Sequence, residues 1–269
     1  MRVFTVQGGF STSISQWQLL RDLVIRDVKS RYRGTFLGIA WIVLYPVIMM
    51  SVYSFVFGGI FKSRWTNQGN IGDFVVMLFC GLIIFTFFSE VANRAPGAIT
   101  GNPNFVKKVV FPLELLPLVS LGAALFNAAV SFVILCLLIP IASSGFPVTA
   151  VLAPLVLLPL LLMTVGISWG LAALGVFFRD LGQLVGIVTS AMLFLSPVFF
   201  PVASAPEAAR WMLNLNPLTY PIEELRHVLI MGQAPDWVHL GIFLVVASAV
   251  AWAGLWLFQR SRPAFADVL

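Results

Sequence analysis

Long runs of apolar residues without charge dominate this sequence and decide its class of fold. Several stretches of more than about 18 residues contain no Asp, Glu, Lys or Arg, which is enough for a helix to cross a bilayer. Hydrophobic residues make up 59% of the chain and charged residues 10%, against roughly 25% charged in an ordinary soluble domain. The sequence therefore predicts an all-α integral membrane protein.

The lengths of the apolar runs predict six membrane spans. The first, residues 36–61, contains Pro46, and a proline inside a helix predicts a kink. The other five are expected at residues 74–96, 115–139, 151–178, 184–200 and 238–258. Together they form one transmembrane domain, residues 36–269, with both chain ends on the same side of the membrane.

Residues 202–237 are too broken to form another span. They contain two short helix-like pieces, residues 207–214 and 219–231, separated by Asn216 and Pro217. The longer piece would be about 20 Å long as a helix, whereas the hydrocarbon core is about 30 Å thick. We expect a re-entrant or interfacial helical hairpin before the last span.

Residues 1–35 predict a cytoplasmic arm followed by an amphipathic helix. The helix is expected to begin near Ser15, where Gln18 completes a capping-box pattern. Apolar residues then recur at helical spacing, with charged residues on the other side. The apolar arc contains Trp17, Leu20, Val24, Val28 and Tyr32, and the charged arc contains Asp22, Arg26, Lys29 and Arg33. Such a helix lies in the membrane interface, either as a lipid anchor alone or as a docking surface for a cytoplasmic partner.

The distribution of positive charge predicts the orientation. Of the 16 Lys and Arg residues, twelve lie on one side of the proposed spans: Arg2, Arg21, Arg26, Lys29, Arg31, Arg33, Arg94, Lys107, Lys108, Arg179, Arg260 and Arg262. The other side has Lys62, Arg64, Arg210 and Arg226. Because cytoplasmic segments carry the excess of Lys and Arg, we expect cytoplasmic termini. Glu90 and Arg94 are expected to form an i, i+4 ion pair.

The sequence contains little that could catalyse a reaction. None of the four lysines follows a glycine, so the nucleotide-binding GxxxxGK[ST] motif does not occur. The two histidines, His227 and His239, lack the spacing of metal ligands. No span carries an ionisable residue near its centre, which argues against an ion-coupled carrier and against an intramembrane enzyme. We predict no catalytic residue, metal or cofactor in this chain, and an energy source outside it.

Two further patterns concern helix contacts. Small residues four apart permit close helix packing, and they occur at Gly34/Gly38, Gly166/Gly170 and Gly182/Gly186. On the first span, four aromatic residues follow an i+4 ridge: Trp41, Tyr45, Tyr53 and Phe57. This ridge could line a glycan path or pack against lipid or protein.

Six segments in order resemble the type-2 ABC exporter permeases that export polysaccharides. They are residues 26–41 (RDVKSRYRGTFLGIAW) with the following Pro46 and VFG at 56–58, residues 104–112 (NFVKKVVFP), 178–180 (FRD), 196–201 (SPVFFP), 216–219 (NPLT) and 265–269 (FADVL). The similarity is greatest to the exporters of O-antigen and teichoic acid, with the capsule exporters a step away.

This resemblance implies a homodimer of six-span subunits with two copies of a separate cytoplasmic ATPase that binds ATP and Mg²⁺. It implies that residues 13–33 and a coupling helix at 104–112 contact the ATPase. The candidate coupling residues are Asn104, Phe105, Val106, Lys107, Lys108, Arg21, Arg26, Arg179 and Asp180. A canal at the dimer interface would be lined largely by spans one and five, with Trp41, Tyr45, Tyr53, Phe57, Phe194 and Phe199 as candidates.

The function expected from these observations is ATP-driven export of a lipid-linked, O-antigen-like polysaccharide across the cytoplasmic membrane, with this chain as the permease subunit. Nucleic acid is not an expected partner. The alternatives are the same architecture with teichoic acid, capsule, a small lipid or a drug as cargo, a membrane-embedded enzyme of glycan or lipid assembly, and a scaffold subunit.

Overall fold

The computed structural model describes residues 9–60, 71–107, 111–142 and 145–268, and within these ranges the chain is helical with no strand. This confirms the all-α prediction. The α-helices are α1 (Gly9–Tyr32), α2 (Trp41–Tyr53), α3 (Ile71–Arg94), α4 (Gly97–Thr100), α5 (Pro103–Lys107), α6 (Leu115–Ala142), α7 (Ala153–Phe177), α8 (Leu181–Phe194), α9 (Glu207–Leu215), α10 (Thr219–Arg226), α11 (Trp237–Ser261) and α12 (Phe265–Val268).

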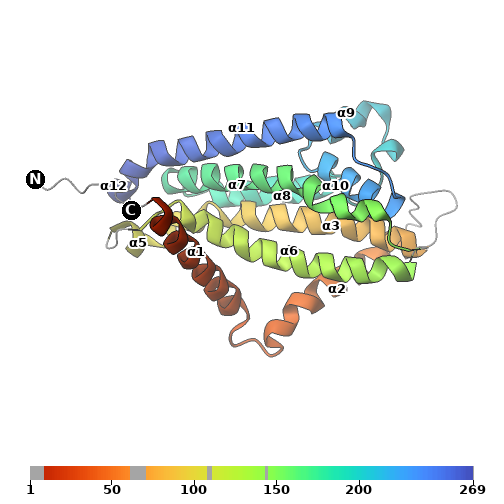
Figure 1. The fold of residues 1–269 in the computed structure, drawn as a ribbon, viewed down its shortest axis with the longest axis horizontal. Coiled ribbons are helices and arrows are strands. Elements are labelled where there is room, and N and C mark those ends of the chain that lie inside the picture. Colours follow the sequence, from red (N-terminus) through yellow and green to blue (C-terminus); the bar gives the residue numbers. More distant parts are fainter. Residues whose placement is uncertain (1–8, 61–70, 108–110, 143–144, 269) are drawn as a thin grey trace, which may run out of the picture.

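The long helices run side by side, and α3 lies at the centre of the bundle (Figure 1). In an 18-residue apolar stretch of α3, 72% of the residues are buried, because α6, α7, α8 and α10 all pack against this helix. The first span contains α2 and the π-helical segment η2 (Ser54–Ile60), and only 6% of a stretch of the same length is buried there. Within the described part of the chain, it therefore leaves a long apolar surface uncovered.

Helices α7 and α11 form the most extensive helix pair, and two glycines explain their close approach. A Cβ atom on Gly166 of α7 would overlap the carbonyl oxygen of Val250 in α11. A Cβ atom on Gly254 of α11 would overlap the carbonyl oxygen of Gly166. Neither position accepts a side chain, which confirms Gly166 as a helix-contact residue. Gly34 and Gly38 instead adopt positive φ angles of 83° and 54° in the turn after α1.

Among the described residues, five helical segments are long and apolar enough to cross a membrane. They are residues Gly38–Ile60, Gly72–Arg94, Leu115–Ile141, Val148–Phe177 and Trp237–Val268. The predicted fifth span, residues 184–200, overlaps the 14-residue helix α8 (Leu181–Phe194), which ends before the span does. Pro197 explains this end, because proline lacks an amide donor and disfavours the helical conformation in the residue before it.

The two ends of the bundle carry different short elements (Figure 1). One end, here the α5 end, carries α5, α12 and the first half of α1. The other, the α10 end, carries α9, α10 and the π-helical segment η5 (His227–Met231). The amphipathic helix begins at Gly9 and not at Ser15, so the predicted capping box lies inside the helix.

Candidate functional site

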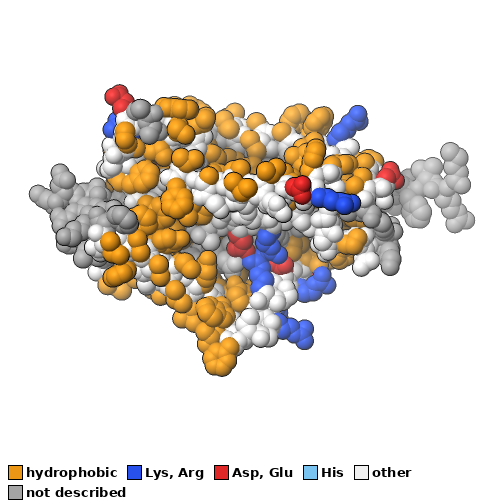
Figure 2. Space-filling model, turned by 180° about the vertical axis from the view of Figure 1, so that it is seen from behind, with side chains coloured by type: hydrophobic (Ala, Val, Ile, Leu, Met, Phe, Trp, Pro, Cys, Tyr) orange, Lys and Arg blue, Asp and Glu red, His pale blue; other side chains and the backbone are white. Residues whose placement is uncertain are grey.

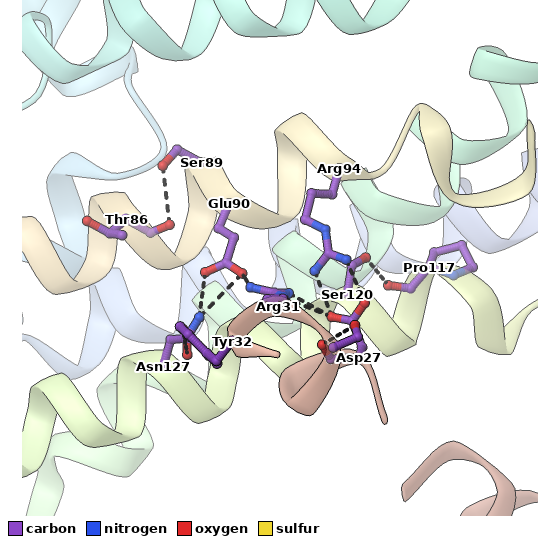
Figure 3. A network of polar contacts seen from close by, with 11 residues as sticks. Asp27, Arg31, Tyr32, Thr86, Ser89, Glu90, Arg94, Pro117, Ser120 and Asn127 are labelled. Carbon is purple, nitrogen blue, oxygen red and sulfur yellow. Dashed lines mark hydrogen bonds and ion pairs between the residues drawn. The ribbon is translucent and has the colours of Figure 1, made fainter. Parts of the chain in front are cut away.

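Four charged side chains join α1 to α3, and this charge network consists of Asp27, Arg31, Glu90 and Arg94 (Figure 3). Arg94 donates from Nη1 and Nη2 to the two carboxylate oxygens of Asp27, at 3.0 and 2.8 Å. Arg31 donates from Nε and Nη2 to Asp27 Oδ2, at 3.0 and 2.9 Å. Its Nη1 also donates to Glu90 Oε1. The charges of two carboxylates and two guanidinium groups therefore cancel within one cluster.

The network corrects the pairing expected from sequence. The i, i+4 spacing predicts that Glu90 and Arg94 pair with each other along α3, but each instead pairs with a residue of α1. Burial alone would lower the pKa of Arg31, but the hydrogen bond and charge of Glu90, followed by those of Asp27, raise this pKa above its ordinary value. Arg31 is thus held in its charged form.

Helix α6 completes the network through Asn127. Its amide nitrogen donates to Glu90 Oε2 at 3.2 Å, and its amide oxygen accepts from the Tyr32 hydroxyl at 3.5 Å. In the same helix, Gly122 lets α1 come close, because a Cβ atom there would lie 2.6 Å from Val24 Cγ2. Helix α1 is therefore fixed to two helices of the bundle by polar and apolar contacts together.

A cavity of about 590 Å³ opens beside this network, between α1, α2, α3 and α6. Its polar end is lined by Arg31, Glu90 and Asn127. Its other walls are mainly apolar and aromatic, and they include three of the predicted canal residues: Trp41, Tyr45 and Tyr53. A cavity of this size is typical of small-molecule sites, and its lining suits a ligand with polar and apolar parts.

The other three predicted canal residues, Phe57, Phe194 and Phe199, meet Tyr53 at the α10 end. These four residues form an aromatic cluster. Phe199 is 4% exposed, and its ring stacks on Phe57 with centroids 4.3 Å apart. Its ring centroid also lies 5.3 Å from that of Tyr53 and 6.1 Å from that of Phe194. Aromatic residues of the predicted spans one and five are thus in contact.

The predicted coupling residues that the structure describes lie in α1, in α5 and in the turn between α7 and α8. Helix α1 begins at the same end of the bundle that carries α5 (Figure 1). Arg21, Arg26, Asn104, Arg179 and Asp180 are exposed, whereas Phe105 and Val106 are half-buried beside the C-terminal segment. The side chain of Lys107 and the whole of Lys108 lie outside the described part of the chain. From behind, most visible basic side chains gather on the half that carries α1 and α5 (Figure 2).

Sequence reasoning missed the role of Asp27 and the burial of Arg226. A signal for the network did exist, because Asp27 and Arg31 are four residues apart on one helix and Glu90 and Arg94 are four apart on another. Two such pairs in facing helices can exchange partners. Among the described residues, no three His, Cys, Asp or Glu side chains come together as metal ligands.

Comparisons with known proteins agree over nearly the whole chain. The model of the ABC-2 type transporter family matches residues 18–230. The chain is 32% identical over 252 residues to the O-antigen export system permease protein RfbA of Myxococcus xanthus, covering 93% of this chain and 94% of that relative. It is 25% identical to a Klebsiella pneumoniae protein of the same name, covering 94% and 95%. It is 27% identical to the polysialic acid transport protein KpsM of Escherichia coli, covering 90% and 93%.

The long apolar helices define a multi-pass membrane protein, with the charge network and the cavity between its helices. The family match covers most of the chain. The chain belongs to the ABC-2 type transporter family, which confirms its resemblance to the type-2 ABC exporter permeases.

Proposed function

We propose that this chain is the permease subunit of an ABC exporter that moves a lipid-linked, O-antigen-like polysaccharide across the cytoplasmic membrane. One observation carries the proposal: the 32% identity to an O-antigen export permease extends over 93% of the chain. Relatives of this kind are transport permeases, so the chain itself is not an enzyme. The ATP and Mg²⁺ bind to a separate ATPase subunit.

The assembly that follows is a homodimer with two ATPase subunits. Both chain ends are cytoplasmic, and α8 with residues 195–200 serves as the fifth of six crossings in the dimer. The exposed Arg21, Arg26 and Asn104 support an ATPase contact at the α5 end. The large uncovered apolar surface of α2 and the exposed Phe194 of α8 support a second copy as their partner.

Coupling in this proposal runs through α1. An ATPase that closes on ATP displaces α1 and α5 together, and the charge network passes the displacement of α1 to α3 and α6. Because the cavity is lined by all four of α1, α2, α3 and α6, its shape changes with that displacement. Two-state repacking of this kind is how small shifts become large motions.

The test is reconstitution of the chain in vesicles with its ATPase and a lipid-linked polysaccharide. We expect glycan transfer that depends on ATP and stops when the ATPase carries a substitution in its own P-loop lysine. The P-loop variant is the matched control, since it keeps the complex assembled. Glycan transfer by the purified permease without any ATPase would contradict the proposal.

A second cargo is favoured by one comparison. The polysialic acid transport protein KpsM is 27% identical over 90% of the chain, which supports an acidic capsule-like glycan as the alternative. Supplying O-antigen-like, teichoic acid and capsule-like substrates to the same vesicles separates these candidates by their relative rates of transfer.

A further inference from the structure

Arg226 is the last residue of α10, and its side chain is completely buried. The sequence places this arginine in a segment outside the spans, where a solvated charge is expected. A buried guanidinium in a membrane protein is costly unless its donors are paired, and such residues are retained for function. Its partners therefore indicate what it does.

Three backbone carbonyl groups from two other parts of the chain accept hydrogen bonds from Arg226, and together with it they form what we call the arginine clamp. The Nε atom donates to the carbonyl oxygen of Met77 in α3 at 3.0 Å. Nη1 donates to that of Pro197 at 2.7 Å, and Nη2 to that of Val198 at 3.1 Å. Glu223 accepts a further bond at 3.0 Å. The planar fork of donors thus joins α10, α3 and the chain after α8.

A glycine in α3 leaves the space that the arginine clamp occupies. A Cβ atom on Gly81 of α3 would lie 2.9 Å from Nη2 of Arg226 and 3.1 Å from Cα of Val198. Pro197 and Val198 follow the end of α8, so their carbonyl groups lie beyond its helical hydrogen bonds. The arginine satisfies these carbonyl groups and fixes the backbone there.

The residue that follows this fixed backbone is Phe199, the centre of the aromatic cluster. Its ring stacks on Phe57 and contacts Tyr53, both of which belong to the first span. Tyr53 also lines the cavity that begins at the charge network. Through Tyr53, the aromatic cluster therefore adjoins one wall of the cavity.

We propose that Arg226 is the positioning residue of a closure at the aromatic cluster: it fixes residues 197–198 so that Phe199 seals the path between the first span and α8 in the resting transporter. The seal opens when Phe199 separates from Phe57 and Tyr53 while the arginine clamp holds the backbone behind it. This inference rests on the proposed function, because it assumes that the cavity belongs to a permeation path.

One readout measures the backbone and does not depend on transport. Val198 is fully buried, so the thiol introduced by Val198→Cys in a Cys80→Ala/Cys136→Ala background is protected from a maleimide reagent. We expect Arg226→Gln to raise the rate of labelling about tenfold or more, as loss of charge-assisted hydrogen bonds predicts. Arg226→Lys gives an intermediate rate, since an ammonium group cannot span the three carbonyls.

The second readout measures the seal. Vesicles of phosphatidylethanolamine and phosphatidylglycerol are loaded with calcein and contain the permease–ATPase complex without ATP. We expect wild-type vesicles to stay tight, and those with Arg226→Gln or Phe199→Ala to release dye several-fold faster. Phe199→Ala leaves the arginine clamp intact, so it leaks without faster labelling of the thiol introduced by Val198→Cys. A purely structural arginine would lower protein yield and leave the surviving complexes tight.

Matched controls separate position from chemistry. Arg210→Gln removes another arginine of the same hairpin, one that is exposed, and leaves both readouts unchanged. If Arg226→Gln does not assemble, Gly81→Ala displaces the arginine clamp without removing the arginine, and Gly241→Ala in α11, which meets no neighbour within 4 Å, is its control.

The outcomes distinguish the two proposals. The proposed seal alone is overturned if assembled Arg226→Gln or Gly81→Ala complexes export glycan normally, keep vesicles tight and keep the thiol at position 198 protected. Tight vesicles with Phe199→Ala also overturn it. Absence of glycan export by the wild-type complex, with leakage and labelling as expected, overturns the proposed function instead.

Discussion

The two ends of the bundle use arginine in opposite ways. In the charge network, Arg31 and Arg94 bond to the carboxylates of Asp27 and Glu90, and the four side chains are 19% to 37% exposed. In the arginine clamp, Arg226 is completely buried and bonds chiefly to backbone carbonyl groups. Side-chain partners can exchange and are screened by salt, whereas backbone carbonyl groups in a buried loop cannot move away without losing their bonds.

From this difference we expect the contacts of the charge network to rearrange more readily than those of the arginine clamp. The charge network can slide or re-pair at modest cost, which suits a helix that follows an ATPase. The arginine clamp keeps one loop in one position until a larger force is applied. The comparison leads to four predictions, which follow from the largest expected effect to the smallest.

Loss of the buried arginine is expected to destabilise the protein most. Arg226→Gln leaves three buried carbonyl groups without their charged donor, a cost of roughly 3 kcal/mol in free energy of unfolding. Arg94→Gln, at a side chain 37% exposed, costs about 1 kcal/mol or less. Thermal unfolding of the detergent-solubilised proteins compares the two. Equal losses would remove the distinction between the ends.

Salt is expected to weaken the charge network and to leave the arginine clamp unchanged. A double-mutant cycle of Asp27→Asn and Arg94→Gln gives a coupling energy of about 1 kcal/mol at low salt. The coupling shrinks in about 1 M NaCl, where the Debye length is about 3 Å. The stability deficit of Arg226→Gln stays constant over the same range. A cycle whose coupling is insensitive to salt would show that the network is as enclosed as the arginine clamp.

Hydropathy and periodicity predicted the helices well, because lipid leaves so few choices to a backbone. Five of the six predicted spans lie where the structure has long apolar helical segments. The predicted fifth span extends to residue 200, whereas α8 ends at Phe194, because the apolar residues 195–200 include Pro197. Hydropathy registers the apolar surface and not the missing amide donor.

The polar contacts were harder to predict because they depend on which helices face each other. The i, i+4 spacing of Glu90 and Arg94 suggested a local pair, but Asp27 and Arg31 offer the same geometry across the interface. From sequence, Arg226 is expected to be a solvated charge outside the spans. Nothing in its own segment indicates that it would bond to the carbonyl groups of Met77 and Val198. Family resemblance placed the aromatic residues of spans one and five together, and their rings do meet, while the canal itself stays a prediction.

Close packing of α1 on α6 provides a smaller test of the mobile end. Gly122→Ala places a Cβ atom 2.6 Å from Cγ2 of Val24, and valine cannot swing aside because its χ1 angle is restricted. We expect α1 to detach more often, with trypsin cutting at the exposed Arg21 and Arg26 a few-fold faster. Val24→Ala restores protection in the same chain.

Gly170→Ala is the control for this experiment, because a Cβ atom there meets nothing within 4 Å. If Gly122→Ala leaves the rate of trypsin cleavage unchanged, α1 is held by the charge network alone. The apolar half of its attachment would then contribute nothing to its position.

The smallest effect is expected from Asp236, an exposed carboxylate at the α10 end that caps α11. A hydrogen bond from the His239 ring at 2.7 Å, followed by one from the His239 backbone amide, lowers the pKa of this carboxyl group. Its stabilisation is therefore complete above the ordinary Asp pKa of about 3.9 and is lost as the pH falls through the lowered folded pKa. The difference in unfolding midpoint between wild type and Asp236→Asn should shrink as the pH falls below about 4. A difference that did not shrink in acid would mean that the cap works without its charge. Because this carboxylate is solvated, its removal tests the surface of the α10 end and leaves the buried arginine clamp as the source of its rigidity.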